Sequence, residues 1–134
     1  MKIPKNLIIA EVGQNHDGSL GIAHSYIDEI AKSGADAVKF QMHFADEESS
    51  FDDKFRKKFS YKKETRYEYW KRMEFSVDEW RELYKHAKAK NLIFICSPFS
   101  NKAFNILNKI GVQFWKIASG EIDNFEMISN MIKT

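Results

Sequence analysis

The stretch GADAVKFQ, residues 34–41, decides the fold because it joins the end of a helix to a buried strand. Apolar side chains recur at helical spacing over residues 20–33. Gly34 suits the position after that helix, because glycine adopts a positive φ without steric strain. Residues 35–40 form a short apolar run that contains Lys39 near its end, as expected of a parallel strand covered on both faces. The segment therefore predicts one helix-to-strand step.

The same step recurs on both sides of this segment. Short apolar runs predict strands at residues 7–10, 92–95 and 112–117. Helices are expected at residues 77–90, between a cap at Ser100 and an end at Gly111, and after a box-like start at Asp123. Four alternating units predict an α/β fold of parallel (β/α) units forming about half of a TIM (β/α)8 barrel, since a whole barrel takes ~250 residues. A small doubly wound sheet is the alternative, although the first turn lacks G-x-G-x-x-G.

The region between the second and third strands combines a long polar segment with a clear helix start. Residues 42–66 are polar and long for a loop, which predicts local helical pieces or a functional excursion. The sequence SVDE at residues 76–79 matches a capping box, with Phe75 and Trp80 placed to form a hydrophobic staple. Bases and aromatics interleave over residues 54–63, but neighbouring acids dilute the charge, so a solvated face is favoured over nucleic-acid binding.

Composition narrows the class of protein. The 21 basic and 19 acidic residues give a net charge of +2, which does not suggest a general nucleic-acid binder. No apolar run approaches the ~20 residues needed to cross a bilayer, so no membrane partner is expected. The single cysteine, Cys96, excludes an intramolecular disulfide and makes the cytoplasm the simplest location. Within an apolar strand, Cys96 is expected to be a small buried hydrophobe.

Polar side chains follow each predicted strand at its carboxyl end. They are Glu11, Lys39, Ser97 and Lys116, with Ser119 and Glu121 just beyond the last strand. Barrel enzymes do their chemistry at this edge, so these side chains should converge on one pocket. Two lysines with hydroxyl donors suit a small multi-anionic ligand such as a phosphorylated carboxylic acid, and the glutamates are placed to orient hydroxyls or move protons. Alternatively, the lysines pair with the glutamates as internal salt bridges.

Four motifs in a fixed order give the chain a family resemblance. They are IAEVGQNHDG at residues 9–18, GADAVKFQ at 34–41, SPF at 97–99 and KIASGE at 116–121. With them the chain resembles the sialic acid synthase family, which includes N-acetylneuraminate, legionaminate and pseudaminate synthases. One departure is Cys96-Ser97, where the family often has Ser-Thr; serine keeps the hydroxyl.

The resemblance implies a transferase of carbohydrate biosynthesis. It would condense phosphoenolpyruvate with an open-chain N-acylhexosamine, such as N-acetylmannosamine, to give a nine-carbon 2-keto acid and phosphate. By position, the residues that match the family's phosphoenolpyruvate-binding residues are Lys39, Ser97, Lys116 and Ser119. Glu11 and Glu121 match its catalytic acidic residues, and the further site-lining candidates are Asn15, His16 and Gln41.

The resemblance also implies parts that lie outside this chain. A divalent metal, manganese or magnesium, would polarise the aldehyde, with ligands on later strands; the four histidines here show no ligand spacing, and His24 and His86 fall on predicted helices as surface residues. Residues 1–134 would then be a single partial domain, lacking the remaining barrel and the C-terminal antifreeze-like domain. Its open strand edges invite pairing with another chain, so a homo-oligomer is expected.

Two other functions stay open. One is a catalytically silent fragment or binding module that retains affinity for phosphoenolpyruvate, because half of a barrel is missing. The other is a phosphoenolpyruvate-dependent synthase that uses another aldose acceptor.

Overall fold

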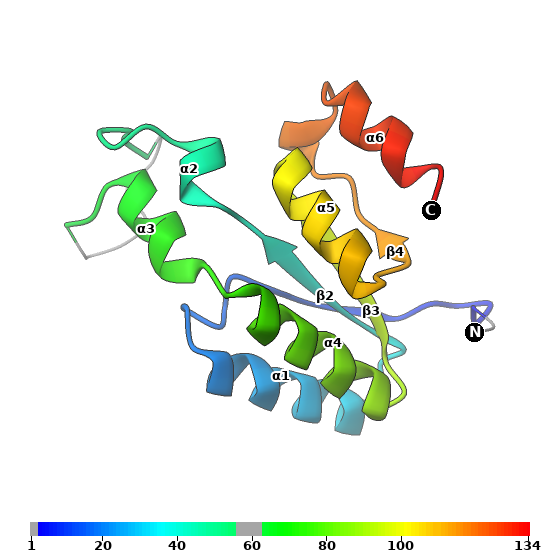
Figure 1. The fold of residues 1–134 in the computed structure, drawn as a ribbon. Helices are drawn as coiled ribbons and strands as arrows, with labels where there is room; N and C mark the ends of the chain where they lie inside the picture. The colour runs from blue at the N-terminus through cyan, green and yellow to red at the C-terminus, as the bar shows by residue number, and fades with distance from the viewer. Residues whose placement is uncertain (1–2, 56–62) are drawn as a thin grey trace.

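Strands and helices alternate along the chain in the computed structural model, which describes residues 3–55 and 63–134 (Figure 1). In chain order the elements are β1 (Ile9–Gly13), α1 (Leu20–Ser33), β2 (Ala37–Met42), α2 (Ala45–Glu48), α3 (Arg66–Met73), α4 (Val77–Ala89), β3 (Ile93–Pro98), α5 (Asn101–Ile110), β4 (Phe114–Trp115), the 3-10 helix η1 (Ser119–Glu121) and α6 (Phe125–Met131).

The strands form a parallel sheet in the order β1-β2-β3-β4, the order in which they follow one another along the chain. A doubly wound sheet reverses its strand order at a switch point, whereas a (β/α)8 barrel adds each strand beside the preceding one. The sheet therefore confirms the predicted α/β class and corresponds to about half of such a barrel.

Local capping signals placed most helix ends correctly. The hydroxyls of Ser19, Ser76 and Ser100 each accept an N–H bond in the first turn of α1, α4 and α5. Gly34 and Gly111 end α1 and α5 with φ values of 82° and 97°, in the left-handed region that glycine tolerates. The capping box of α4 is complete, and the predicted staple is formed by two rings whose centroids lie 5.6 Å apart.

One helix start was wrong by a residue. α6 begins after Asn124, whose side chain accepts from the Met127 N–H at 3.2 Å, rather than after Asp123. The Asp123 carbonyl instead accepts from the Phe125 N–H at 2.9 Å, in the turn that follows η1. Asparagine and aspartate are equally good N-caps, so turn geometry decided between them.

Strand boundaries differ more from the prediction. β1 begins at Ile9, two residues later than the strand predicted at residues 7–10. The Ile8 N–H donates to the Asp36 carboxylate at 2.8 Å instead of to a neighbouring strand. As a result Glu11, expected after the strand, lies within β1. β4 has 2 residues rather than the whole of 112–117, because its register with β3 contains only the pairs Ile95–Phe114 and Cys96–Trp115.

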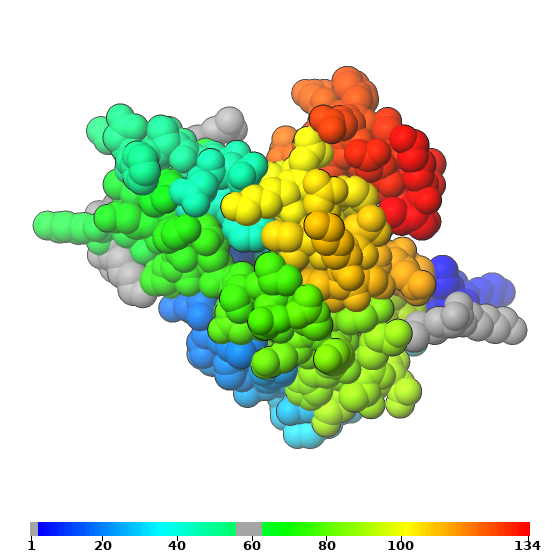
Figure 2. Space-filling view, in the orientation of Figure 1, coloured from blue at the N-terminus to red at the C-terminus, as the bar shows by residue number. Residues whose placement is uncertain are grey.

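The two faces of the sheet are covered differently. The helices α1, α4 and α5 cover one face (Figure 1), and from that side they form an almost continuous surface (Figure 2). The main core beneath them includes Val12, Ile27, Val38, Phe40, Leu83, Phe94, Cys96 and Leu107. The opposite face carries a smaller cluster of Ala37, Ile93 and Ile95, with Phe114 against it. That second face corresponds to the interior of a barrel.

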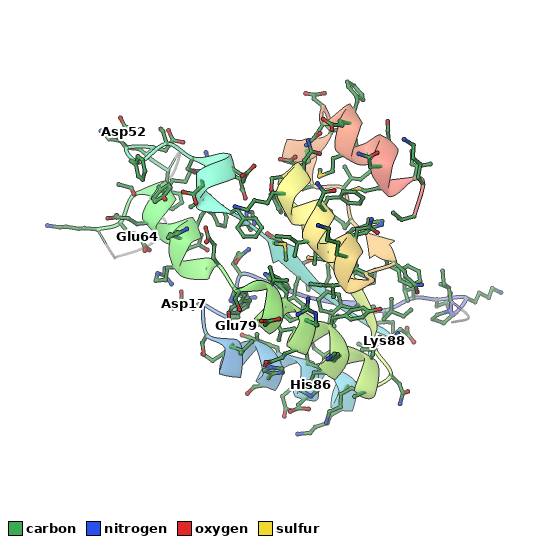
Figure 3. All side chains as sticks on the ribbon, viewed as in Figure 1. Asp17, Asp52, Glu64, Glu79, His86 and Lys88 are labelled. Atoms are coloured by element: carbon green, nitrogen blue, oxygen red, sulfur yellow. The ribbon has the colours of Figure 1, made fainter. Side chains whose placement is uncertain are left out.

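The segment after β2 is an excursion with helical pieces, as predicted. It contains α2 and leads into α3, and both lie beyond the carboxyl end of β2 (Figure 1). Arg72 of α3 bonds Asp17 of the first loop and Glu64, at 3.0 Å for the latter; both acids are labelled in Figure 3. These carboxylates hold the pKa of Arg72 above its ordinary value. Residues 56–62 of the predicted basic stretch lie outside the described residues.

Gly18 gives a direct test of how closely α3 packs on the first loop. Its φ is +77°, and a Cβ there would lie 2.1 Å from the Arg72 carbonyl oxygen. We expect Gly18→Ala to lower the free energy of unfolding by about 2 kcal/mol, because the left-handed conformation and the overlap both disfavour a side chain. Urea unfolding measures this change.

Gly21 is the matched control because it lies in α1, where the nearest atom to a new Cβ is at 3.9 Å. Gly21→Ala should raise the free energy of unfolding by roughly 0.5–1 kcal/mol. Equal destabilisation by the two substitutions would contradict the packing described here.

Candidate active site

Lys39 lies on the face of the sheet that the helices leave uncovered. Side chains alternate across a strand, and its neighbours Val38 and Phe40 both belong to the helix-side core. The register places Lys39 beside Glu11 of β1 and Ile95 of β3. Its ammonium forms an ion pair with the Glu11 carboxylate, so the salt bridge that was the alternative interpretation is present for this pair.

Ser97 stands on the same face, two residues beyond Ile95 and beside Gln41 in the register. The residue is 1% exposed, yet within the described residues its hydroxyl has no hydrogen-bond partner. A buried polar group without a partner is unfavourable by about 1–3 kcal/mol, which is why such groups mark places where a ligand or water binds. The serine hydroxyl therefore supports an anion site at this edge.

Lys116 extends the same face beyond β4. Its N–H donates to the Cys96 carbonyl at 3.1 Å, and alternation from Phe114 puts its side chain on the uncovered face. Among residues 3–55 and 63–134 its ammonium makes no ion pair, so the predicted pairing with Glu121 is not formed there. At this edge of the sheet the Lys39 ammonium is thus paired with Glu11, whereas the Lys116 side chain is exposed.

Ser119 and Glu121 lie in η1, just past the last strand. Ser119 is exposed. The Glu121 carboxylate accepts from the Asn124 side chain at 3.2 Å, and so it braces the start of α6. Their contact with a substrate stays a prediction.

The candidates from the first loop divide into two groups. Asn15 is exposed, and its N–H donates to the Val12 carbonyl at 3.0 Å. His16 is fully buried, with its ring 4.6 Å from that of Phe75 and 6.4 Å from that of Phe40, both in the helix-side core. The structure therefore sets His16 in the core and leaves Asn15 at the surface.

Burial makes His16 a source of pH-dependent stability. Desolvation lowers the pKa of His16 from 6.5 to about 4. Between these pH values the unfolded chain binds a proton that the folded chain does not, so stability is present above pH 6.5 and is lost as pH falls toward 4. The expected slope is at most about 1.4 kcal/mol per pH unit.

His16→Asn should reduce this slope, because asparagine does not titrate but can still accept the Gly18 N–H that His16 Nδ1 accepts at 3.1 Å. Denaturant unfolding of both proteins across this pH range gives the comparison. Identical slopes would show that His16 does not carry the effect.

Gln41 is the site-lining candidate with the clearest contacts. Its side-chain Nε2 donates to Glu11 Oε1 at 3.2 Å, and its Oε1 faces His43 Nε2 at 3.3 Å. His43 was missed as a site residue by sequence reasoning. The alternation of side chains along a strand could have pointed to it, because residues 39, 41 and 43 fall on one face if the extended conformation continues past the strand.

Two other predictions concern residues away from this edge. Cys96 is fully buried, and burial raises the pKa of its thiol, so the predicted role as a small buried hydrophobe is confirmed. His24 and His86 lie on α1 and α4 as predicted, with their Nδ1 atoms 2.7 Å apart; His86 is labelled in Figure 3. Burial and then His86 lower the pKa of His24.

Residues 3–55 and 63–134 supply no set of three or more histidine, cysteine, aspartate or glutamate side chains arranged to hold a metal ion. A divalent metal is therefore not accounted for by this part of the chain. Across the same described ranges, each helix is too short or too polar to cross a membrane.

Comparison with known protein families agrees with this geometry, because the sequence model of the NeuB family matches residues 26–134. The chain belongs to the NeuB family. This confirms the resemblance that the four motifs carried.

Individual NeuB relatives match nearly all of the chain. The N,N'-diacetyllegionaminic acid synthase of Campylobacter jejuni is 36% identical over 132 residues, covering 96% of this chain and 40% of the relative. The human N-acetylneuraminate-9-phosphate synthase is 34% identical over 129 residues, covering 94% and 36%. Among solved structures, the sialic acid synthetase of Leptospira borgpetersenii in complex with citrate has a TM-score of 0.74 at 33% identity, covering 94% of this chain and 42% of that one. This NeuB-family chain thus spans less than half the length of these relatives.

Proposed function

We propose that the NeuB-family protein containing this chain is an N-acetylneuraminate synthase-type transferase of carbohydrate biosynthesis. It would join C3 of phosphoenolpyruvate to the aldehyde carbon of an N-acylated hexosamine such as N-acetylmannosamine. Water adds at C2 of phosphoenolpyruvate, and cleavage of the C–O bond releases phosphate and a nine-carbon 2-keto sugar acid. The activities for which the Campylobacter and human relatives are named support this class of reaction.

The observation that carries the proposal is the common face of Lys39, Ser97 and Lys116. Phosphoenolpyruvate bears a phosphate and a carboxylate, and both groups favour ammonium and hydroxyl donors. The buried Ser97 hydroxyl, which has no partner among the described residues, lies on β3, between β2 with Lys39 and β4, which leads to Lys116. Ser119 follows Lys116 closely and is exposed, so it is placed to add a further donor.

Glu11 and Glu121 are proposed as the acidic groups of the reaction. Glu11 is held from both of its oxygens, by Lys39 and by Gln41, so its carboxylate is oriented before any substrate binds. An oriented carboxylate can accept a proton or position a hydroxyl. The divalent metal, manganese or magnesium, would polarise the aldehyde, and its ligands are proposed to lie outside this chain.

The wider setting of the protein is also a proposal. We place it in the cytoplasm, with the remaining barrel and an antifreeze-like domain following residue 134. β1 and β4 each have one neighbour in the described sheet, and such open edges favour pairing. Where these edges are not closed by the rest of a barrel, residues 1–134 are expected to form a homo-oligomer, and sedimentation of this chain measures it; a monodisperse monomer would contradict this expectation.

The test is phosphate release from phosphoenolpyruvate by the full-length gene product, given a divalent metal and an acceptor sugar. N-acetylmannosamine, its 6-phosphate and a plain aldose phosphate should be compared in one assay. The proposal expects release that depends on an N-acylated acceptor. Release only with the plain aldose phosphate would favour the synthase that uses another aldose acceptor, and no release with any amino sugar would contradict the proposal.

A further inference from the structure

His43 is a buried histidine directly after β2, and its ring is clamped between two aromatic side chains. Its side chain is 3% exposed. The Trp70 ring of α3 stacks on one face at 3.8 Å and 9°, and the Phe99 ring, just after β3, stacks on the other at 3.9 Å and 26°. The plane of the imidazole is therefore fixed by residues from two separate parts of the chain.

Hydrogen bonds at both ring nitrogens fix the remaining freedom of this ring. Nδ1 lies 2.8 Å from Glu48 Oε2, and Nε2 lies 3.3 Å from Gln41 Oε1. The second Glu48 oxygen accepts from the Phe44 N–H at 2.9 Å, so the carboxylate cannot swing away without losing that bond. The Glu11 carboxylate accepts from the Gln41 NH2 group, which leaves the amide oxygen toward the ring. An amide oxygen only accepts hydrogen bonds, so His43 Nε2 donates to Gln41, and one further proton lies between Nδ1 and Glu48 Oε2.

This donor sets the orientation of the Gln41 amide. With its oxygen toward His43, the amide presents its NH2 group to Glu11 Oε1 at 3.2 Å. The reversed amide would bring two donors together at His43 and an oxygen against the Glu11 carboxylate, and both contacts are unfavourable. Lys39 holds the other Glu11 oxygen. A chain of contacts thus runs from α2 to the proposed catalytic carboxylate.

We propose that His43, supported by Glu48, is a positioning residue that fixes the Gln41 amide and through it the carboxylate of Glu11. This inference rests on the proposed function, because the value of an oriented Glu11 lies in the condensation reaction. It also gives the excursion after β2 a role, since α2 supplies Glu48 and α3 supplies Trp70. His43 itself does not contact the substrate in this account.

The test uses two substitutions in the full-length gene product. His43→Phe keeps a stacked ring and removes both hydrogen bonds, whereas His43→Gln supplies an N–H donor toward Gln41. We expect His43→Phe to lower kcat by roughly 10- to 100-fold, as is typical when an outer partner of a site residue is lost. The KM for phosphoenolpyruvate should change by less than about twofold, because the lysines and Ser97 are untouched. His43→Gln should recover part of kcat.

The control is His24→Phe, which removes a partly buried histidine that hydrogen-bonds His86 between α1 and α4, away from the sheet edge. Its kcat should match that of the unaltered protein. If His43→Phe keeps its kcat, or if kcat falls only together with the melting temperature and His43→Gln restores nothing, the positioning role is wrong.

Failure of the proposed function is distinguishable from failure of this inference. If the unaltered protein releases no phosphate, crystal structures of the unaltered and His43→Phe proteins replace the kinetic comparison. The inference then expects the Gln41 amide to be reversed or disordered and Glu11 to be displaced in the variant. An unchanged Gln41–Glu11 contact would overturn it.

Discussion

Lys39→Met in the full-length gene product should lower kcat/KM for phosphoenolpyruvate by roughly 10²- to 10³-fold, the loss typical of removing one preorganised charged or hydrogen-bonding group from an active site. The ammonium is the more buried of the two lysine groups, with its side chain 13% exposed, so water replaces it poorly. The substitution also leaves the Glu11 carboxylate without its cation. Steady-state phosphate release with varied phosphoenolpyruvate measures the effect.

Lys90→Met is the matched control for this prediction. Lys90 also forms an ion pair, with Asp28 at 2.7 Å, but it lies at the end of α4 and both partners are partly exposed. An exposed pair contributes about 0–1 kcal/mol to stability, so kcat/KM should stay within about twofold of the unaltered value. A loss with Lys90→Met as large as that with Lys39→Met would show that the effect is not specific to the site.

Phe40→Ala should lower the free energy of unfolding by about 3–5 kcal/mol, the usual range for deleting a buried aromatic ring. Phe40 is fully buried in β2, with its ring stacked on that of Phe94 at 5.6 Å and edge-on to that of Trp80 at 6.2 Å. It therefore joins the sheet to α4. Urea unfolding followed by circular dichroism measures the change.

Phe125→Ala is the comparison because Phe125 is 71% exposed at the start of α6. Its substitution should change the free energy of unfolding by less than about 0.5 kcal/mol. If both substitutions destabilise the protein equally, the helix-side core does not have the composition described.

Features with local causes were predicted well from the sequence. The helix ends at Ser76 and Gly34 follow from hydrogen bonds and backbone angles within a few residues. Strand limits depend on pairing between distant segments, which is why β1 begins later than its apolar run and β4 is short. The sequential parallel order followed from the repeated strand–helix pattern.

The candidate site was predicted in its positions but not in its connections. Their positions at the carboxyl ends of the predicted strands placed Lys39, Ser97 and Lys116 at one edge of the sheet, but these positions left open which charges would pair. The structure forms the Lys39–Glu11 pair. His43 was not predicted because the rings that stack on it, those of Trp70 and Phe99, lie far from it along the chain, and no short motif predicts such a contact.

The central claim is that one sheet face gathers these cations and the Ser97 hydroxyl around a single anion. A crystal of the full-length gene product soaked in phosphoenolpyruvate tests this most directly. We predict density for the ligand in contact with the ammonium groups of Lys39 and Lys116 and with the Ser97 hydroxyl. Ligand bound elsewhere, with the two lysines directed to separate regions of the molecule, would contradict the account.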